Sequence, residues 1–188
     1  MSDAHRLRKS HNFSIYLTSF SVILLISGLL FLKEGSRLQN AVFLIGAALI
    51  AISAFESKNH MVTFLEAIII LGIITAFFPL ISLSVHLLMI LLPALGVIAF
   101  LSYAGYYRKE RINAIATASL ICFAFGFSLN APSYVTVFSL FLSLGSFLFV
   151  VYGSLSFYMY KGNMQVPLVV LNAIFGVSSF ILFLSSVR

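Results

Sequence analysis

The sequence predicts an all-α integral membrane protein, a bundle of seven transmembrane helices joined by short loops. The first observation is composition: of 188 residues, 61% are hydrophobic and only 9% are charged. A soluble domain of this length needs more charge to cover its surface. The second observation is that apolar runs of about 20 residues, the length that crosses a bilayer core, follow one another along the chain. The third is an unequal distribution of lysine and arginine between alternate loops.

Seven apolar runs are expected to form the helices of a single transmembrane domain, residues 13–188. Residues 1–12 are expected to form a basic cytoplasmic tail. The first run follows basic residues as in a signal peptide, but it has 20 residues and lacks a small-x-small cleavage site. We therefore interpret it as the first transmembrane helix. The predicted helices cover about residues 13–32, 38–55, 61–78, 82–107, 112–130, 133–160 and 165–187.

Prolines divide the longest apolar stretches. Residues 61–107 form a 47-residue stretch with little charge. As one helix it would be about 70 Å long, twice what a bilayer core requires. Pro79 is predicted to end the incoming helix, and Ser82 or Ser84 to cap the next one. Pro132 likewise separates the fifth and sixth helices.

The basic residues predict the orientation of the bundle. If the helices alternate, the N-terminus shares one side of the membrane with the loops near residues 56–60, 108–111 and 161–164. Eight lysines and arginines lie on that side and three on the other. The positive-inside rule then places the N-terminus inside and the C-terminus outside. We expect a multi-pass protein of the cell membrane, which in a prokaryote is the inner or cytoplasmic membrane. The eight are Arg6, Arg8, Lys9, Lys58, Arg108, Lys109, Arg111 and Lys161, and the three are Lys33, Arg37 and Arg188.

One carboxylate, Glu66 in "TFLEAIII", lies inside a predicted span. A charge at the bilayer centre costs about 2.5–3.5 kcal/mol, and less near the interface. Protonation, a hydrated crevice or a polar partner would offset that cost. Counting residues along antiparallel helices places Tyr103, Thr117, Ser156 and Asn172 at a similar depth. Two interpretations of this candidate site stay open. One is a proton or cation site, or a carboxylate bound to a lipid head group or partner helix; the other is a protonated glutamic acid that fixes helix packing.

A second polar site is predicted near the outer ends of the helices, at His86 and Asn130. His60 lies at the inner surface, so the two histidines cannot hold a haem together. Glu34 is the only acidic residue on the outer side, which argues against a metal at His86. We interpret His86 as a hydrogen-bonded interfacial histidine, with contact to a quinone or other ligand as the alternative.

The residues that several kinds of membrane-protein chemistry require are absent from this sequence. The seventh helix has no lysine for a retinal Schiff base, and no phosphate-binding glycine loop or zincin histidine pair is present. No aspartate lies in any span, and the single Cys122 excludes an intrachain disulfide. We therefore expect no self-contained enzyme, no cofactor and no metal. Membrane orientation accounts for the basic loops, so no nucleic-acid partner is expected.

The first functional expectation is a non-catalytic hydrophobic subunit of a larger integral membrane complex, for example an energy-transducing or respiratory one. Its partners would be membrane lipids and other integral membrane subunits. The alternative is a small secondary transporter or channel that uses Glu66 as a proton or cation site. A lipid-handling protein with an opening between helices is a third possibility. A transporter needs a cavity that reaches Glu66, whereas a subunit needs protein contact along an outer face.

In architecture, the predicted bundle resembles subunit III of haem-copper oxidases. The shared features are seven short-looped helices, an inside N-terminus and a glutamate in the third helix, here Glu66. The histidine- and tryptophan-containing segments typical of that subunit are absent from this chain. The resemblance carries over no functional residue.

Overall fold

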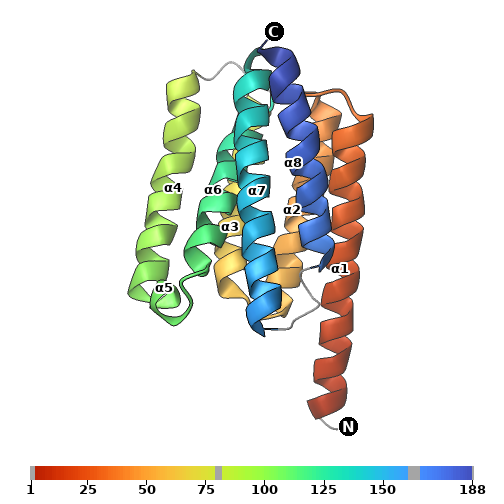
Figure 1. Ribbon diagram of the computed structural model, residues 1–188, viewed down its shortest axis with the longest axis vertical. Coiled ribbons are helices and arrows are strands. Elements are labelled where there is room, and N and C mark those ends of the chain that lie inside the picture. Colours follow the sequence, from red (N-terminus) through yellow and green to blue (C-terminus); the bar gives the residue numbers. More distant parts are fainter. Residues whose placement is uncertain (1–2, 79–81, 161–165, 188) are drawn as a thin grey trace.

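The chain is an all-α protein, as the sequence predicts, and Figure 1 shows its long helices running side by side. The computed structural model describes residues 3–78, 82–160 and 166–187. Within these residues there are eight α-helices and one short 3₁₀ turn. They are α1 (Asp3–Phe31), α2 (Arg37–Glu56), α3 (His60–Ala76), α4 (Leu83–Tyr103), α5 (Tyr106–Lys109), α6 (Asn113–Ser128), η1 (Pro132–Tyr134), α7 (Val135–Tyr160) and α8 (Val166–Ser186).

Helix boundaries follow local chemistry, with two differences from expectation. Helix α1 begins at Asp3, inside the segment expected to be a tail. Helix α4 ends at Tyr103, because Gly105 adopts the left-handed conformation (φ 77°) that glycine tolerates without strain, and the four-residue α5 follows. Ser82 occupies the N-cap of α4 without a side-chain hydrogen bond. The break predicted at Pro79 falls on residues 79–81, outside the described part of the chain.

Six helices form a closed ring. In the order α1, α2, α3, α6, α7, α8, each helix packs against the next, and α8 returns to pack against α1. Helix α4 lies outside this ring, where it contacts α3 and α6 (Figure 1). The N-terminal and C-terminal ends of the chain lie at opposite ends of the bundle (Figure 1). Buried apolar side chains such as Phe43, Leu65 and Leu142 fill the contacts between ring helices.

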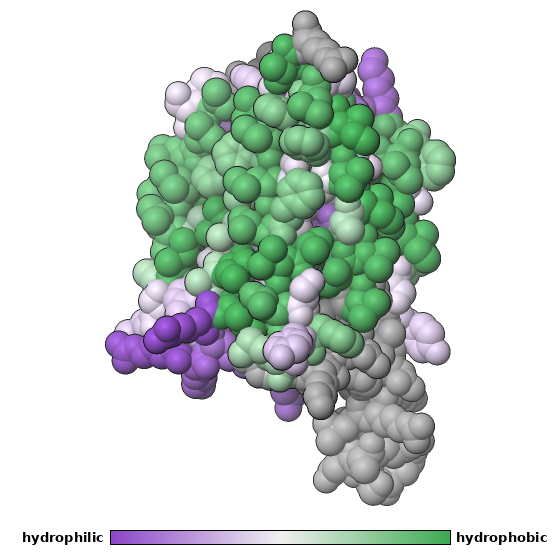
Figure 2. Space-filling view, viewed as in Figure 1, coloured by the Kyte–Doolittle hydropathy of each residue, from purple (hydrophilic) through white to green (hydrophobic). Residues whose placement is uncertain are grey.

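The outer surface of the bundle is typical of a membrane protein. Four helical segments are long and apolar enough to cross a membrane: Arg37–Glu56, Leu83–Tyr103, Val135–Met159 and Val169–Ser186. Figure 2 shows a broad apolar band across the middle of one face, with hydrophilic residues gathered at the end where α5 lies. Three further apolar helical segments are shorter, namely Tyr16–Phe31, His60–Ala76 and Asn113–Ser128.

Small residues let the ring helices approach closely. The tightest approach joins α3 to α6, where a Cβ built on Gly72 would overlap the carbonyl oxygen of Ala124. On the other side of α6, the Ser119 hydroxyl donates to the Gly145 carbonyl at 2.7 Å and links α6 to α7. The ring is therefore held at fixed backbone spacing on both sides of α6.

Candidate functional site

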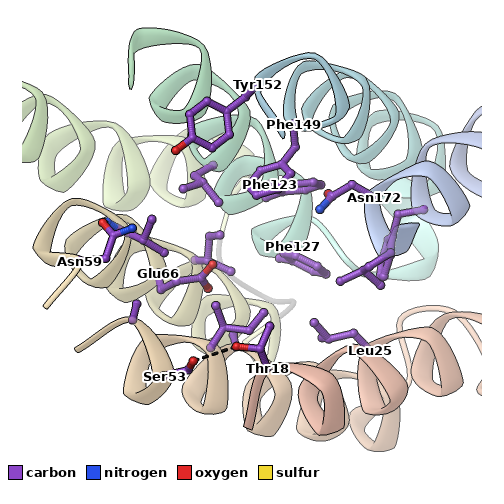
Figure 3. A pocket seen from close by; sticks show the side chains of 18 of the residues that line it. Thr18, Leu25, Ser53, Asn59, Glu66, Phe123, Phe127, Phe149, Tyr152 and Asn172 are labelled. Carbon is purple, nitrogen blue, oxygen red and sulfur yellow. Dashed lines mark hydrogen bonds between the residues drawn. The ribbon is translucent and has the colours of Figure 1, made fainter. Parts of the chain in front are cut away.

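A partly open cavity of about 200 Å³ lies within the ring, and all six ring helices contribute to its wall. Figure 3 shows the lining side chains converging from these helices. Most of the wall is aliphatic or aromatic. The polar members are Thr18, Ser53, Ser57, Asn59, Glu66, Tyr152 and Asn172.

Glu66 is the one carboxylic acid among the described lining residues, and no lysine, arginine or histidine accompanies it there. Its side chain is only 5% exposed, and its carboxyl group points into the cavity (Figure 3). Within the described part of the chain, this group makes no hydrogen bond or ion pair. Buried carboxyl groups normally have such a partner, because burial without one costs free energy. The carboxyl group of Glu66 is therefore available to hydrogen-bond or pair with a ligand inside a mainly apolar cavity.

Aromatic rings form much of the remaining wall. The centroids of Phe123 and Phe127, one turn apart on α6, are 6.3 Å from each other. Phe149 on α7 packs edge-on against Tyr152, with ring centroids 5.6 Å apart. Figure 3 shows these rings from α6 and α7 across the cavity from Ser53 and Thr18. The site thus pairs one acidic group with several aromatic surfaces.

A chain of hydroxyl groups between α1 and α2 connects the cavity wall to the end of the bundle. The Thr18 hydroxyl lies 2.7 Å from that of Ser53, which lies 2.6 Å from Ser14 Oγ. Ser14 Oγ is in turn 2.7 Å from the hydroxyl of Ser57, an exposed residue at the C-cap of α2. Each hydroxyl both donates and accepts, so the chain can relay hydrogen bonds inward. Sequence reasoning missed these residues, although Ser14 with Thr18 and Ser53 with Ser57 show the i, i+4 spacing of one helix face.

Of the four residues expected to lie at the depth of Glu66, the structure brings only one to the cavity that Glu66 lines. Asn172 on α8 lines the same cavity. Thr117 instead lies 3.1 Å from the hydroxyl of Tyr107 in the α5 segment. Ser156 is buried on α7 but is not among the lining residues, and Tyr103 is 93% exposed at the end of α4. None of these three side chains lines the cavity.

The two residues of the expected outer site have separate surroundings. Asn130 Nδ2 donates to Gln39 Oε1 at 3.0 Å and to Asn40 Oδ1 at 2.7 Å, while its Oδ1 accepts from the Gly35 amide at 3.2 Å. His86, 2% exposed, makes no hydrogen bond with Asn130, and its Nδ1 has no partner among the described residues. Asn130 therefore anchors the α1–α2 connection to the end of α6.

Asn130→Ala is expected to destabilise the bundle by about 2–3 kcal/mol, because it leaves the buried oxygen of Asn40 without its donor. Thermal unfolding in detergent, followed by a dye that fluoresces on reaction with the single cysteine, Cys122, measures the effect. Ser185→Ala serves as the control, since that exposed hydroxyl bonds only within its own helix. Equal unfolding temperatures for the two variants would contradict the anchoring role.

No cluster of three or more histidine, cysteine, aspartate or glutamate side chains suited to a metal ion occurs in residues 3–78, 82–160 and 166–187. Comparison with protein-family models, with curated proteins and with solved structures gives no match.

Proposed function

We propose that this chain is a small secondary transporter of the cell membrane, in which Glu66 binds a proton or cation inside the central cavity. One observation carries the proposal. The carboxyl group of Glu66 points into a cavity between the ring helices and has no hydrogen-bond or ion-pair partner in the described chain. An ionisable group within a membrane span is costly, and such groups mark ion and substrate pathways. A glutamate that only fixed helix packing would be bonded to a neighbouring helix.

The proposal includes seven membrane crossings, with the N-terminus inside and the C-terminus outside. Its support is the excess of basic residues at one end and the position of the two termini at opposite ends of the bundle (Figure 1). Helices α3 and α6, with 17 and 16 residues, are about 25 Å long, slightly less than a bilayer core of about 30 Å. The bilayer can adapt to such a mismatch at modest cost.

Access to the cavity is proposed from the inner end. Ser57 and Asn59, which line the cavity, belong to the exposed connection between α2 and α3. The hydroxyl chain from Ser57 to Thr18 follows the same direction into the ring. Polar groups along this route can form hydrogen bonds with the water molecules around an entering ion before the ion reaches Glu66.

Proteoliposomes loaded with a pH-sensitive dye test the proposal. Under a potassium-diffusion potential, the unaltered protein is expected to carry protons faster than empty vesicles. Glu66→Gln, which keeps the shape but cannot exchange a proton, should lower this flux at least about tenfold. Glu56→Gln is the matched control, because that glutamate lies exposed at the end of α2. Equal flux in unaltered protein and empty vesicles would overturn proton coupling at Glu66.

A non-catalytic subunit of a larger membrane complex is the second candidate, and the position of α4 favours it. This helix lies outside the ring and exposes Leu88, Leu92 and Leu95. Extraction from native membranes in mild detergent tests the idea with Leu92→Glu as the variant. A chain that co-purifies with the unaltered protein and is lost from the variant would support a subunit, whereas a lone copy would favour the transporter.

A further inference from the structure

We infer that the cavity at Glu66 binds a small organic ammonium ion that carries an apolar group about the size of one aromatic ring. This inference deepens the proposed function and rests on it, since it names the class of substrate. The charge of the cavity determines the charge of the ligand, the chemistry of the wall determines its class, and the volume determines its size.

The charge of the ligand follows from the ionisable groups of the wall. Glu66 is the one acid there, and the described lining contains no basic side chain that could neutralise it. A carboxylate in an apolar cavity is stabilised strongly by a cation at hydrogen-bond distance, because the local dielectric screens little. An anionic ligand would meet a like charge and lose its hydration without compensation. The cavity therefore selects a cation.

The wall chemistry favours an organic ammonium ion over a metal ion. Calcium and magnesium require six or more oxygen ligands, and near Glu66 the wall is mainly apolar. The rings of Phe123, Phe127 and Phe149 instead present surfaces that attract an ammonium group and its carbon substituents. The ammonium hydrogens can donate to the carboxylate of Glu66, which has no donor of its own in the described chain.

Volume sets the size of the apolar part. An engineered protein cavity of about 150 Å³ accepts benzene, whereas sites for drug-sized ligands measure about 300–1,000 Å³. The cavity of about 200 Å³ lies between these values. It can hold one ring with a short aminoalkyl chain, and it is smaller than the sites that bind drug-sized ligands.

Three probes of nearly equal shape separate charge from hydrophobicity: 2-phenylethylamine, 2-phenylethanol and phenylacetate. Their binding to the full-length protein in lipid nanodiscs is measured by calorimetry. In the unaltered protein, the amine is expected to bind at least about tenfold more tightly than the alcohol, and phenylacetate more weakly than both. Glu66→Gln should bring the amine to within about threefold of the alcohol, while Glu56→Gln should leave all three affinities unchanged.

The outcomes separate this inference from the proposed function. Preferential amine binding that Glu66→Gln removes supports the inference, even if proteoliposomes show no flux. Flux that depends on Glu66 without preferential amine binding overturns the ligand class and leaves proton transport standing. Equal binding of amine and alcohol by the unaltered protein overturns the inference directly, and this comparison does not require any variant to fold.

Discussion

Adding a single methyl group at Gly72 is expected to destabilise the bundle by about 3 kcal/mol. A Cβ at this position would overlap the carbonyl oxygen of Ala124, which belongs to the backbone of α6 and cannot rotate away. Relief of this overlap requires α3 and α6 to separate, and both helices are members of the closed ring. The unfolding temperature of Gly72→Ala, measured by the Cys122 dye assay, should therefore fall by about 6–12 °C.

Gly96→Ala is the matched control, because the same methyl group would meet no atom within 4 Å. Gly96 lies inside α4, outside the ring. Alanine there is expected to leave stability unchanged or raise it by up to about 1 kcal/mol through better helix propensity. Similar destabilisation by both substitutions would mean that the close approach of α3 to α6 does not limit the packing of the ring.

Glu66→Leu is expected to stabilise the protein by about 1–3 kcal/mol while it abolishes ion flux and the preference for amines. Leucine is similar to glutamate in volume and can pack against the apolar wall of the cavity. Because Glu66 has no hydrogen-bond partner in the described chain, its replacement leaves no other group without a partner. The physical reason is that an unbonded carboxyl group in an apolar cavity lowers the stability of the folded protein. Thermal unfolding and proteoliposome flux of the same preparation provide the two readings.

The opposite result would favour the structural interpretation of this glutamate. If Glu66 hydrogen-bonded between helices and fixed their packing, Glu66→Leu would lower the unfolding temperature. Glu66→Gln would then restore most of it, since an amide can replace a protonated carboxyl group in such a bond. Loss of stability in the leucine variant with unchanged flux would remove Glu66 from the functional site.

The positions of the helices along the sequence could be predicted because the length of each apolar run and the prolines and charged residues between the runs indicate where a helix begins and ends. Their arrangement could not, because the buried and outer faces of these helices are both apolar and give no amphipathic signal. Sequence therefore did not indicate that α4 lies outside a ring of six helices. The same ambiguity explains the candidate site: counting residues predicts a depth for Tyr103 and Thr117, but it does not predict the direction in which each side chain points.

A polar residue predicted the position of the cavity where it is isolated within an apolar run. Glu66 and Asn172 belong to different helices, yet both line the cavity. The hydroxyl chain from Thr18 to Ser57 was missed because serine and threonine also occur at ordinary helix contacts in membranes. Asn130 was placed with His86 by depth, whereas its three hydrogen bonds lead to Gly35, Gln39 and Asn40.

Modification of Glu66 by an apolar carbodiimide tests most directly whether its carboxyl group lies free in a cavity that small molecules reach. Diisopropylcarbodiimide adds to a protonated carboxyl group, and rearrangement leaves a stable N-acylurea that contains every atom of the reagent. In the folded protein in nanodiscs, peptide mass spectrometry should find this adduct at Glu66, and 2-phenylethylamine should slow its formation. An adduct that forms at Glu66 only after unfolding would contradict the free carboxyl group, and the proposed site would have to be abandoned.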